Sequence, residues 1–61
     1  MERIDIIKYF LSNKIQLNPE ALDFIYLNQN LINKIFEKCK ERRVNFLTLE
    51  KIKQWIGVEF R

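Results

Sequence analysis

Residues 15–22 read IQLNPEAL, and this stretch joins a short apolar alternation to the start of a helix. Asn18 is a favourable N-cap, Pro19 suits the first helical position, and Glu20 suits the positive end of the helix dipole. Three independent signals therefore agree on one boundary. They predict the second helix of the chain over about residues 19–27, which is apolar on nearly all sides and is expected at the centre of a bundle.

A similar motif occurs further along the chain, where residues 45–52 read NFLTLEKI. The order Leu-Thr-Leu-Glu over residues 47–50 repeats the order Leu-Asn-Pro-Glu over residues 17–20. Thr48 is the predicted cap of a fourth helix over about residues 48–56, with Gly57 as its stop and residues 58–61 as a tail in which Phe60 packs back. The residues of this helix expected to face inward are Leu49, Ile52, Trp55 and Ile56.

The extended segments that precede the two caps, residues 15–17 and 44–46, each alternate apolar and polar side chains. Each is too short to form an independent strand pair. We expect the two segments to lie side by side as a very short parallel bridge, which would tie the starts of the second and fourth helices together.

Two further helices are predicted from apolar residues that recur at spacings of three and four. The first, over about residues 2–13, has an inward face expected to consist of Ile4, Ile7, Phe10 and Leu11, widened by Ile6. The third, over about residues 30–43, has a buried stripe expected to consist of Leu31, Ile32, Ile35, Phe36 and Cys39. The predicted fold is an all-α, compact four-helix domain with room for two very short parallel strands.

The composition excludes most catalytic and metal-binding chemistry. The chain has 61 residues, no His and one Cys, so neither a thiolate–imidazole metal set nor an internal disulfide can be assembled. A phosphate-binding loop needs several glycines, and the chain has one. Cys39 has no base beside it in the pattern and is expected to be a small buried apolar residue. We therefore expect neither an enzyme nor a cofactor in this chain.

The size and the apolar pattern also limit where the protein acts. A chain of this length makes one domain, and its single Gly and single Pro disfavour a fold built of hairpins. No segment of the chain approaches the roughly 20 consecutive apolar residues that a membrane span needs. Residues 1–5 lack the charged and then apolar order of a signal peptide. Because a lone thiol is typical of a reducing compartment, we expect a cytoplasmic protein with no membrane partner.

Positive charge is concentrated in the second half of the chain. Residues 1–30 carry three basic and four acidic side chains, whereas residues 31–61 carry eight basic and four acidic ones. An acidic partner is therefore conceivable on that half. The basic residues proposed to contact a protein partner or DNA are Lys38, Lys40, Arg42, Arg43, Lys51 and Lys53.

Three interpretations of these basic residues remain open beside a simple solvated surface. They are an acidic protein partner, DNA, or a module that pairs with itself, although a monomer is expected for the isolated domain. Glu50 near the start of the fourth helix is unfavourable for phosphate contact. Trp55 could stack on a base, but its spacing from Ile52 favours a place in the core.

The order of elements and the two repeated motifs resemble the N-terminal region of the small subunit of archaeal family D DNA polymerase. The matching residues in the first motif are Leu17, Pro19, Glu20, Ala21 and Leu22. The matching residues in the second motif are Leu47, Thr48, Leu49, Glu50 and Ile52. The resemblance covers nearly the whole chain. It departs at Asn13-Lys14, where relatives often place a Gly, and this leaves the geometry of that turn to be determined.

The resemblance implies an N-terminal interaction domain of a larger subunit, similar in fold to the small helical lid domain of AAA+ ATPases. Its partner would be a protein of the polymerase complex, either the large subunit or another replication factor. In that family the phosphodiesterase-like 3′–5′ exonuclease domain lies downstream, and its metal motifs have no counterpart here. The resemblance therefore implies a role in DNA replication without catalytic residues in this chain.

Overall fold

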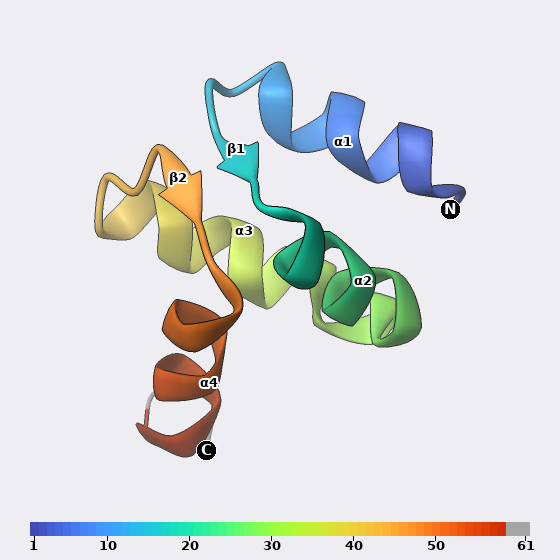
Figure 1. The fold of residues 1–61 in the computed structure, drawn as a ribbon. Helices are drawn as coiled ribbons and strands as arrows, with labels where there is room; N and C mark the ends of the chain where they lie inside the picture. Colours follow the sequence, from blue (N-terminus) through green and yellow to red (C-terminus); the bar gives the residue numbers. More distant parts are fainter. Residues whose placement is uncertain (59–61) are drawn as a thin grey trace.

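The computed structural model describes residues 1–58, which contain four α-helices and a two-stranded parallel sheet (Figure 1). In chain order the elements are α1 (Arg3–Leu11), β1 (Gln16–Leu17), α2 (Pro19–Leu27), the 3₁₀ helix η1 (Gln29–Leu31), α3 (Ile32–Glu41), β2 (Phe46–Leu47) and α4 (Leu49–Val58). This confirms the predicted, mostly helical architecture with two very short parallel strands.

The parallel bridge joins the two halves of the chain. Gln16 lies opposite Phe46 and Leu17 lies opposite Leu47, and the Asn18 N–H donates to the Leu47 carbonyl at 3.0 Å. Because both strands run in the same direction, α2 and α4 begin at the same end of the sheet (Figure 1). The predicted tie between the two helix starts is confirmed.

Both predicted N-caps are present. The Asn18 side-chain oxygen accepts a hydrogen bond from the Ala21 N–H at 2.8 Å, and Pro19 occupies the first turn of α2. The Thr48 hydroxyl accepts a hydrogen bond from the Lys51 N–H at 3.3 Å. Each cap satisfies an amide that the helix itself leaves without a partner.

The helix α1 ends at Leu11, two residues before the predicted end, in a Schellman motif. The Ile15 N–H donates to the Phe10 carbonyl at 3.0 Å, and the Lys14 N–H donates to the Leu11 carbonyl at 2.8 Å. Lys14 has a φ of 61°, in the left-handed region where glycine is usual. The motif reverses the chain so that the buried Ile15 packs back toward the helix.

The helix α3 ends in the same way, at Glu41 rather than at the predicted residue 43. The Val44 N–H donates to the Cys39 carbonyl at 2.8 Å, and the Arg43 N–H donates to the Lys40 carbonyl at 3.2 Å. Arg43 has a φ of 55°. The structural repeat therefore begins earlier than the sequence motif: each half is a helix, a Schellman turn, a strand, a cap and a second helix.

Two other predicted boundaries are wrong. The helix α3 starts at Ile32 rather than at residue 30, because the preceding turn is wound as the 3₁₀ helix η1. The helix α4 continues through Gly57 to Val58, since Gly57 does not adopt the positive φ of a C-terminal stop. The rest of the predicted tail, including Phe60, lies outside the described residues.

The core lies between the helices and the inner face of the sheet. Its buried members are Ile6, Phe10, Ile15, Ala21, Ile25, Ile32, Ile35, Cys39, Leu47, Ile52 and Trp55. Phe10 packs edge-on against Tyr9 and Phe36, with ring centroids 5.6 Å away in each pair. As predicted for the central helix, α2 packs against both α1 and α4, although Leu27 at its end is exposed.

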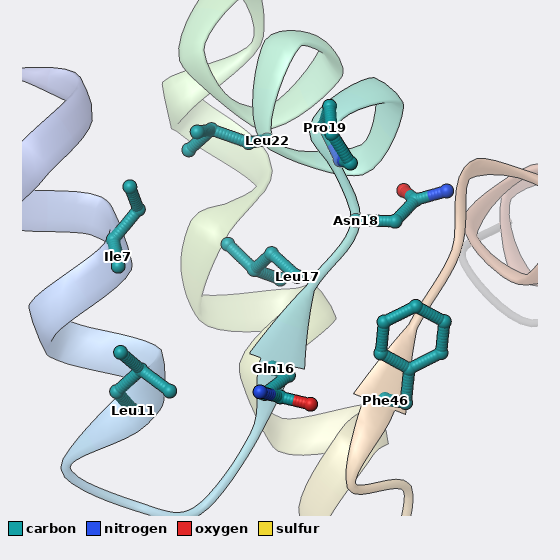
Figure 2. Close-up of a pocket in the computed structure, with 8 residues that line it drawn as sticks. All are labelled: Ile7, Leu11, Gln16, Leu17, Asn18, Pro19, Leu22 and Phe46. Carbon is teal, nitrogen blue, oxygen red and sulfur yellow. The ribbon is translucent and has the colours of Figure 1, made fainter.

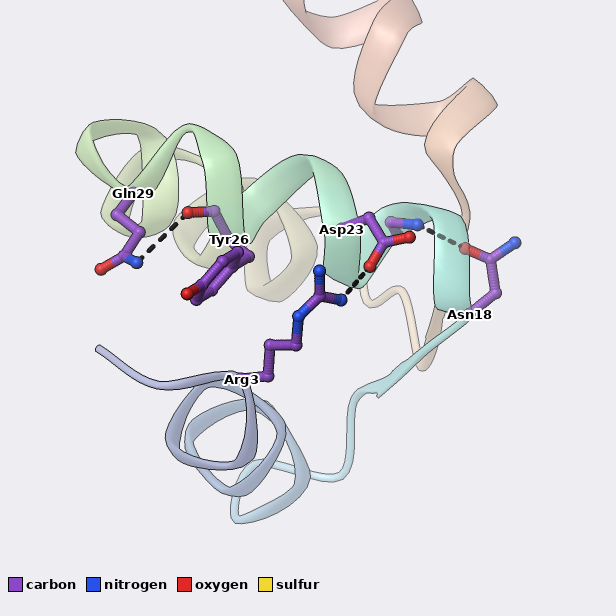
Figure 3. Close-up of polar contacts among 6 residues, drawn as sticks. Arg3, Asn18, Asp23, Tyr26 and Gln29 are labelled. Carbon is purple, nitrogen blue, oxygen red and sulfur yellow. Dashed lines mark hydrogen bonds and ion pairs between the residues drawn. The ribbon is translucent and has the colours of Figure 1, made fainter.

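The rotation of α1 about its axis differs from the prediction. Ile6 and Phe10 face the core, whereas Ile4 and Leu11 are 55% and 48% exposed. Figure 3 shows the surface contacts that accompany this orientation: Arg3 forms an ion pair with Asp23 of α2, and its guanidinium lies 4.7 Å from the centre of the Tyr26 ring. Burial of Ile6 and Phe10 in the core accounts for this orientation, and the exposed Arg3–Asp23 pair contributes little by comparison.

Candidate functional site

An apolar groove opens between α1 and the β1–α2 segment (Figure 2). It has a volume of about 420 Å³, within the range of common ligand pockets, but it is wide open to solvent. Its lining residues are Ile7, Leu11, Gln16, Leu17, Asn18, Pro19, Leu22 and Phe46. None of these side chains is charged, so the groove is suited to apolar groups rather than to an ionic substrate.

Each wall of the groove comes from a different element. In Figure 2, Ile7 and Leu11 extend from α1 toward Leu17 and Leu22, and Phe46 of β2 lies on the other side of β1. Phe46 is 49% exposed. Leu11 on the opposite wall is 48% exposed, and accessible apolar side chains that line one groove are a feature of surfaces that a partner covers.

Phe46 was not predicted as an exposed residue. Its segment, residues 44–46, was expected to alternate like residues 15–17, which sets Phe46 in the position of Leu17. The second half instead contains one extra residue between the turn and the strand, so Leu47 is buried and Phe46 points outward beside Gln16. The alignment of the two motifs on their caps, which sets Leu47 rather than Phe46 opposite Leu17, agrees with the observed register, whereas the alternation of residues 44–46 does not.

Three of the six proposed basic residues gather at the junction of α3 and α4. Arg42 and Lys51 line a shallow cavity of about 290 Å³ together with Val44, Gln54 and Trp55. Lys38 approaches Glu41 at 3.3 Å, and Arg42 approaches the same carboxylate at 3.7 Å. Glu41 therefore offsets part of the positive charge that a phosphate group would meet.

The remaining three proposed basic residues lie elsewhere. The Lys40 ammonium lies 5.4 Å from the centre of the Phe36 ring, on the side of α3 that faces α1. Arg43 occupies the left-handed position of the turn before β2. Lys53 follows Lys51 by two helical positions, which places the two about 160° apart around α4. The six residues therefore do not share one face.

Cys39 is fully buried, as predicted. Burial raises the pKa of its thiol to about 11, and the nearby Lys51 ammonium opposes that shift only in part. The thiol is therefore protonated at neutral pH, which makes it a poor nucleophile. Trp55 is also buried, which confirms its predicted place in the core.

Within residues 1–58, no group of His, Cys, Asp and Glu side chains is arranged to hold a metal ion. No helix in the same range is long and apolar enough to cross a membrane. Comparison with protein-family models, with curated proteins and with solved structures finds no match to this chain.

Proposed function

We propose that this domain is a non-catalytic protein-docking module, and that it serves a replicative DNA polymerase as the N-terminal part of its small subunit. The observation that carries the docking role is the apolar groove, with half-exposed Leu11 and Phe46 on its two sides. Burying such side chains against a partner is favourable by about 25 cal/mol per Å² of apolar surface.

The assignment to DNA replication is supported by the two sequence motifs that resemble the family D small subunit. In the proposed parent protein the polymerase and 3′–5′ exonuclease chemistry would belong to regions outside this chain. The partner would be the large subunit or another replication factor. A single reduced thiol, Cys39, is compatible with action in the cytoplasm.

Direct DNA binding is the second candidate function, and a specific feature favours it. Arg42 and Lys51 border one cavity at the α3–α4 junction, where a phosphate group would meet both cations. The carboxylate of Glu41 lies against Lys38 and Arg42, however, and it weakens the local positive potential. We therefore place protein docking first.

An amide NMR titration separates the two functions. The ¹⁵N-labelled domain is titrated with the polymerase large subunit and, separately, with a short primer–template DNA at low salt. Docking predicts saturable changes with the large subunit around the groove, at residues 4–11, 17–22 and 46. DNA binding predicts changes at residues 38–43 and 51–53 that fall steeply with salt and are lost when Arg42 and Lys51 are replaced by Gln.

Changes with neither the large subunit nor DNA would refute the assignment to a polymerase complex. Changes with DNA alone would make the second function the correct one.

A further inference from the structure

The exposed face of α1 continues the groove along the helix. Ile4, Ile7 and Leu11 follow one another at spacings of three and four residues, so they form one ridge about 10 Å long. Ile4 and Leu11 are about half exposed and Ile7 is partly buried in the groove wall. The ridge and the groove together make an apolar track that is two helical turns long.

Two lysines flank this track. Lys8 lies on the same face of α1, four positions after Ile4 and three before Leu11, and Lys14 lies in the turn that follows. Within residues 1–58 neither lysine takes part in an ion pair. Three acidic residues adjoin track residues in the sequence: Asp5 and Glu20 point about 100° away from Ile4 and Pro19 around their helices, and Asp23 is paired with Arg3.

We propose that the track binds an amphipathic α-helix of a partner protein, with large apolar side chains on one face and acidic residues flanking them. This inference rests on the proposed docking function and specifies the partner's chemistry. Apolar anchors at positions i, i+3 or i+4, and i+7 of the partner match the two-turn length of the Ile4–Leu11 ridge. Its carboxylates would lie beside Lys8 and Lys14 and would select against basic helices.

The test uses two synthetic helical peptides that share an apolar face of leucines. One carries Glu and the other Lys at the flanking positions, and each is titrated into the ¹⁵N-labelled chain. We expect saturable shifts at residues 4–11, 17–22 and 46, with a Kd at least about fivefold lower for the Glu peptide. Lys8→Glu should reverse this preference.

Two further variants locate the contact. Leu11→Glu should weaken binding of the Glu peptide by about tenfold or more, because it places a carboxylate in the apolar track. Leu27→Glu is the matched control: Leu27 is 77% exposed on α2 outside the groove, so its replacement should leave Kd unchanged. Amide spectra of both variants show whether the fold is retained.

The proposal is wrong if neither peptide causes saturable shifts, if both bind equally, or if the shifts lie away from the groove. It is also wrong if groove shifts depend on protein concentration alone, since a second copy would then cover the track. If the peptides fail while the large subunit binds, the docking function stands and only the partner's chemistry is refuted. If the Glu peptide binds and the large subunit does not, the helix site stands and the polymerase assignment fails.

Discussion

Lys14→Gly and Arg43→Gly are each expected to stabilise the domain. Each of these residues occupies the left-handed position of a Schellman motif, with a φ of 61° at Lys14 and 55° at Arg43. A residue with a Cβ loses about 1–2 kcal/mol in that conformation, whereas glycine adopts it freely. Glycine also makes the unfolded chain more flexible, which costs about 0.5–1 kcal/mol. The net gain is therefore about 0.5–1 kcal/mol per site, or a rise of several °C in Tm.

The assay is urea unfolding followed by the fluorescence of the buried Trp55 and by circular dichroism. Lys8→Gly is the matched control, because Lys8 lies inside α1 and the same exchange there should cost about 1 kcal/mol. Lys14→Ala keeps the Cβ and should change stability little. The reasoning about left-handed turns fails if both turn variants are less stable than the parent while Lys14→Ala is neutral.

Three further outcomes follow from the caps, the core and the buried thiol. Asn18→Ala should lower the free energy of unfolding by about 1 kcal/mol, measured by urea unfolding, whereas Asn18→Asp should retain most of it; equal losses would contradict a capping role. Phe10→Ala should cost about 3–5 kcal/mol and leave a chain of this size largely unfolded by circular dichroism, while a native spectrum would contradict a core centred on Phe10. Cys39 should resist alkylation by iodoacetamide at neutral pH until urea unfolds the chain. Folding raises the pKa of this thiol from 9.0 to about 11, so the contribution of Cys39 to stability is complete below pH 9 and is lost as pH rises toward 11. The difference in unfolding free energy between the parent and Cys39→Ala should therefore shift by about 2–3 kcal/mol over that range. A difference that stays constant with pH would refute the assigned pKa.

The features that depend on neighbouring residues in the chain are the ones predictable from the sequence. Asn18, Pro19 and Thr48 act within a few residues of their own positions, so their roles follow from residue type alone. The parallel bridge was also predictable, because the same motif occurs before both caps. Two extended segments that precede the same cap motif can pair with each other as parallel strands.

The rotation of α1 could not be read from its own residues. Ile4, Ile6, Ile7, Phe10 and Leu11 together span so much of the helix surface that several orientations bury a similar apolar area. The packing of the buried Phe10 against Phe36 of α3 distinguishes among them, and it joins residues far apart in the sequence.

The groove was missed for the same reason. An apolar residue predicts burial from its type, but whether a neighbouring element covers it depends on tertiary packing. Leu11 and Phe46 remain accessible because no described helix lies over them. The basic residues were grouped by sequence proximity, and helical geometry then separated Lys51 from Lys53.

The pairing of Gln16 with Phe46 also constrains how the chain reaches its folded state. The bridge closes a loop of about thirty residues, at an entropic cost of ~3 kcal/mol. Helices of nine or ten residues are marginal in water by themselves, so neither half can offset this cost before the other half docks. Folding should therefore be all-or-none, and a chain cut between α2 and α3 should yield two pieces that gain structure only when mixed.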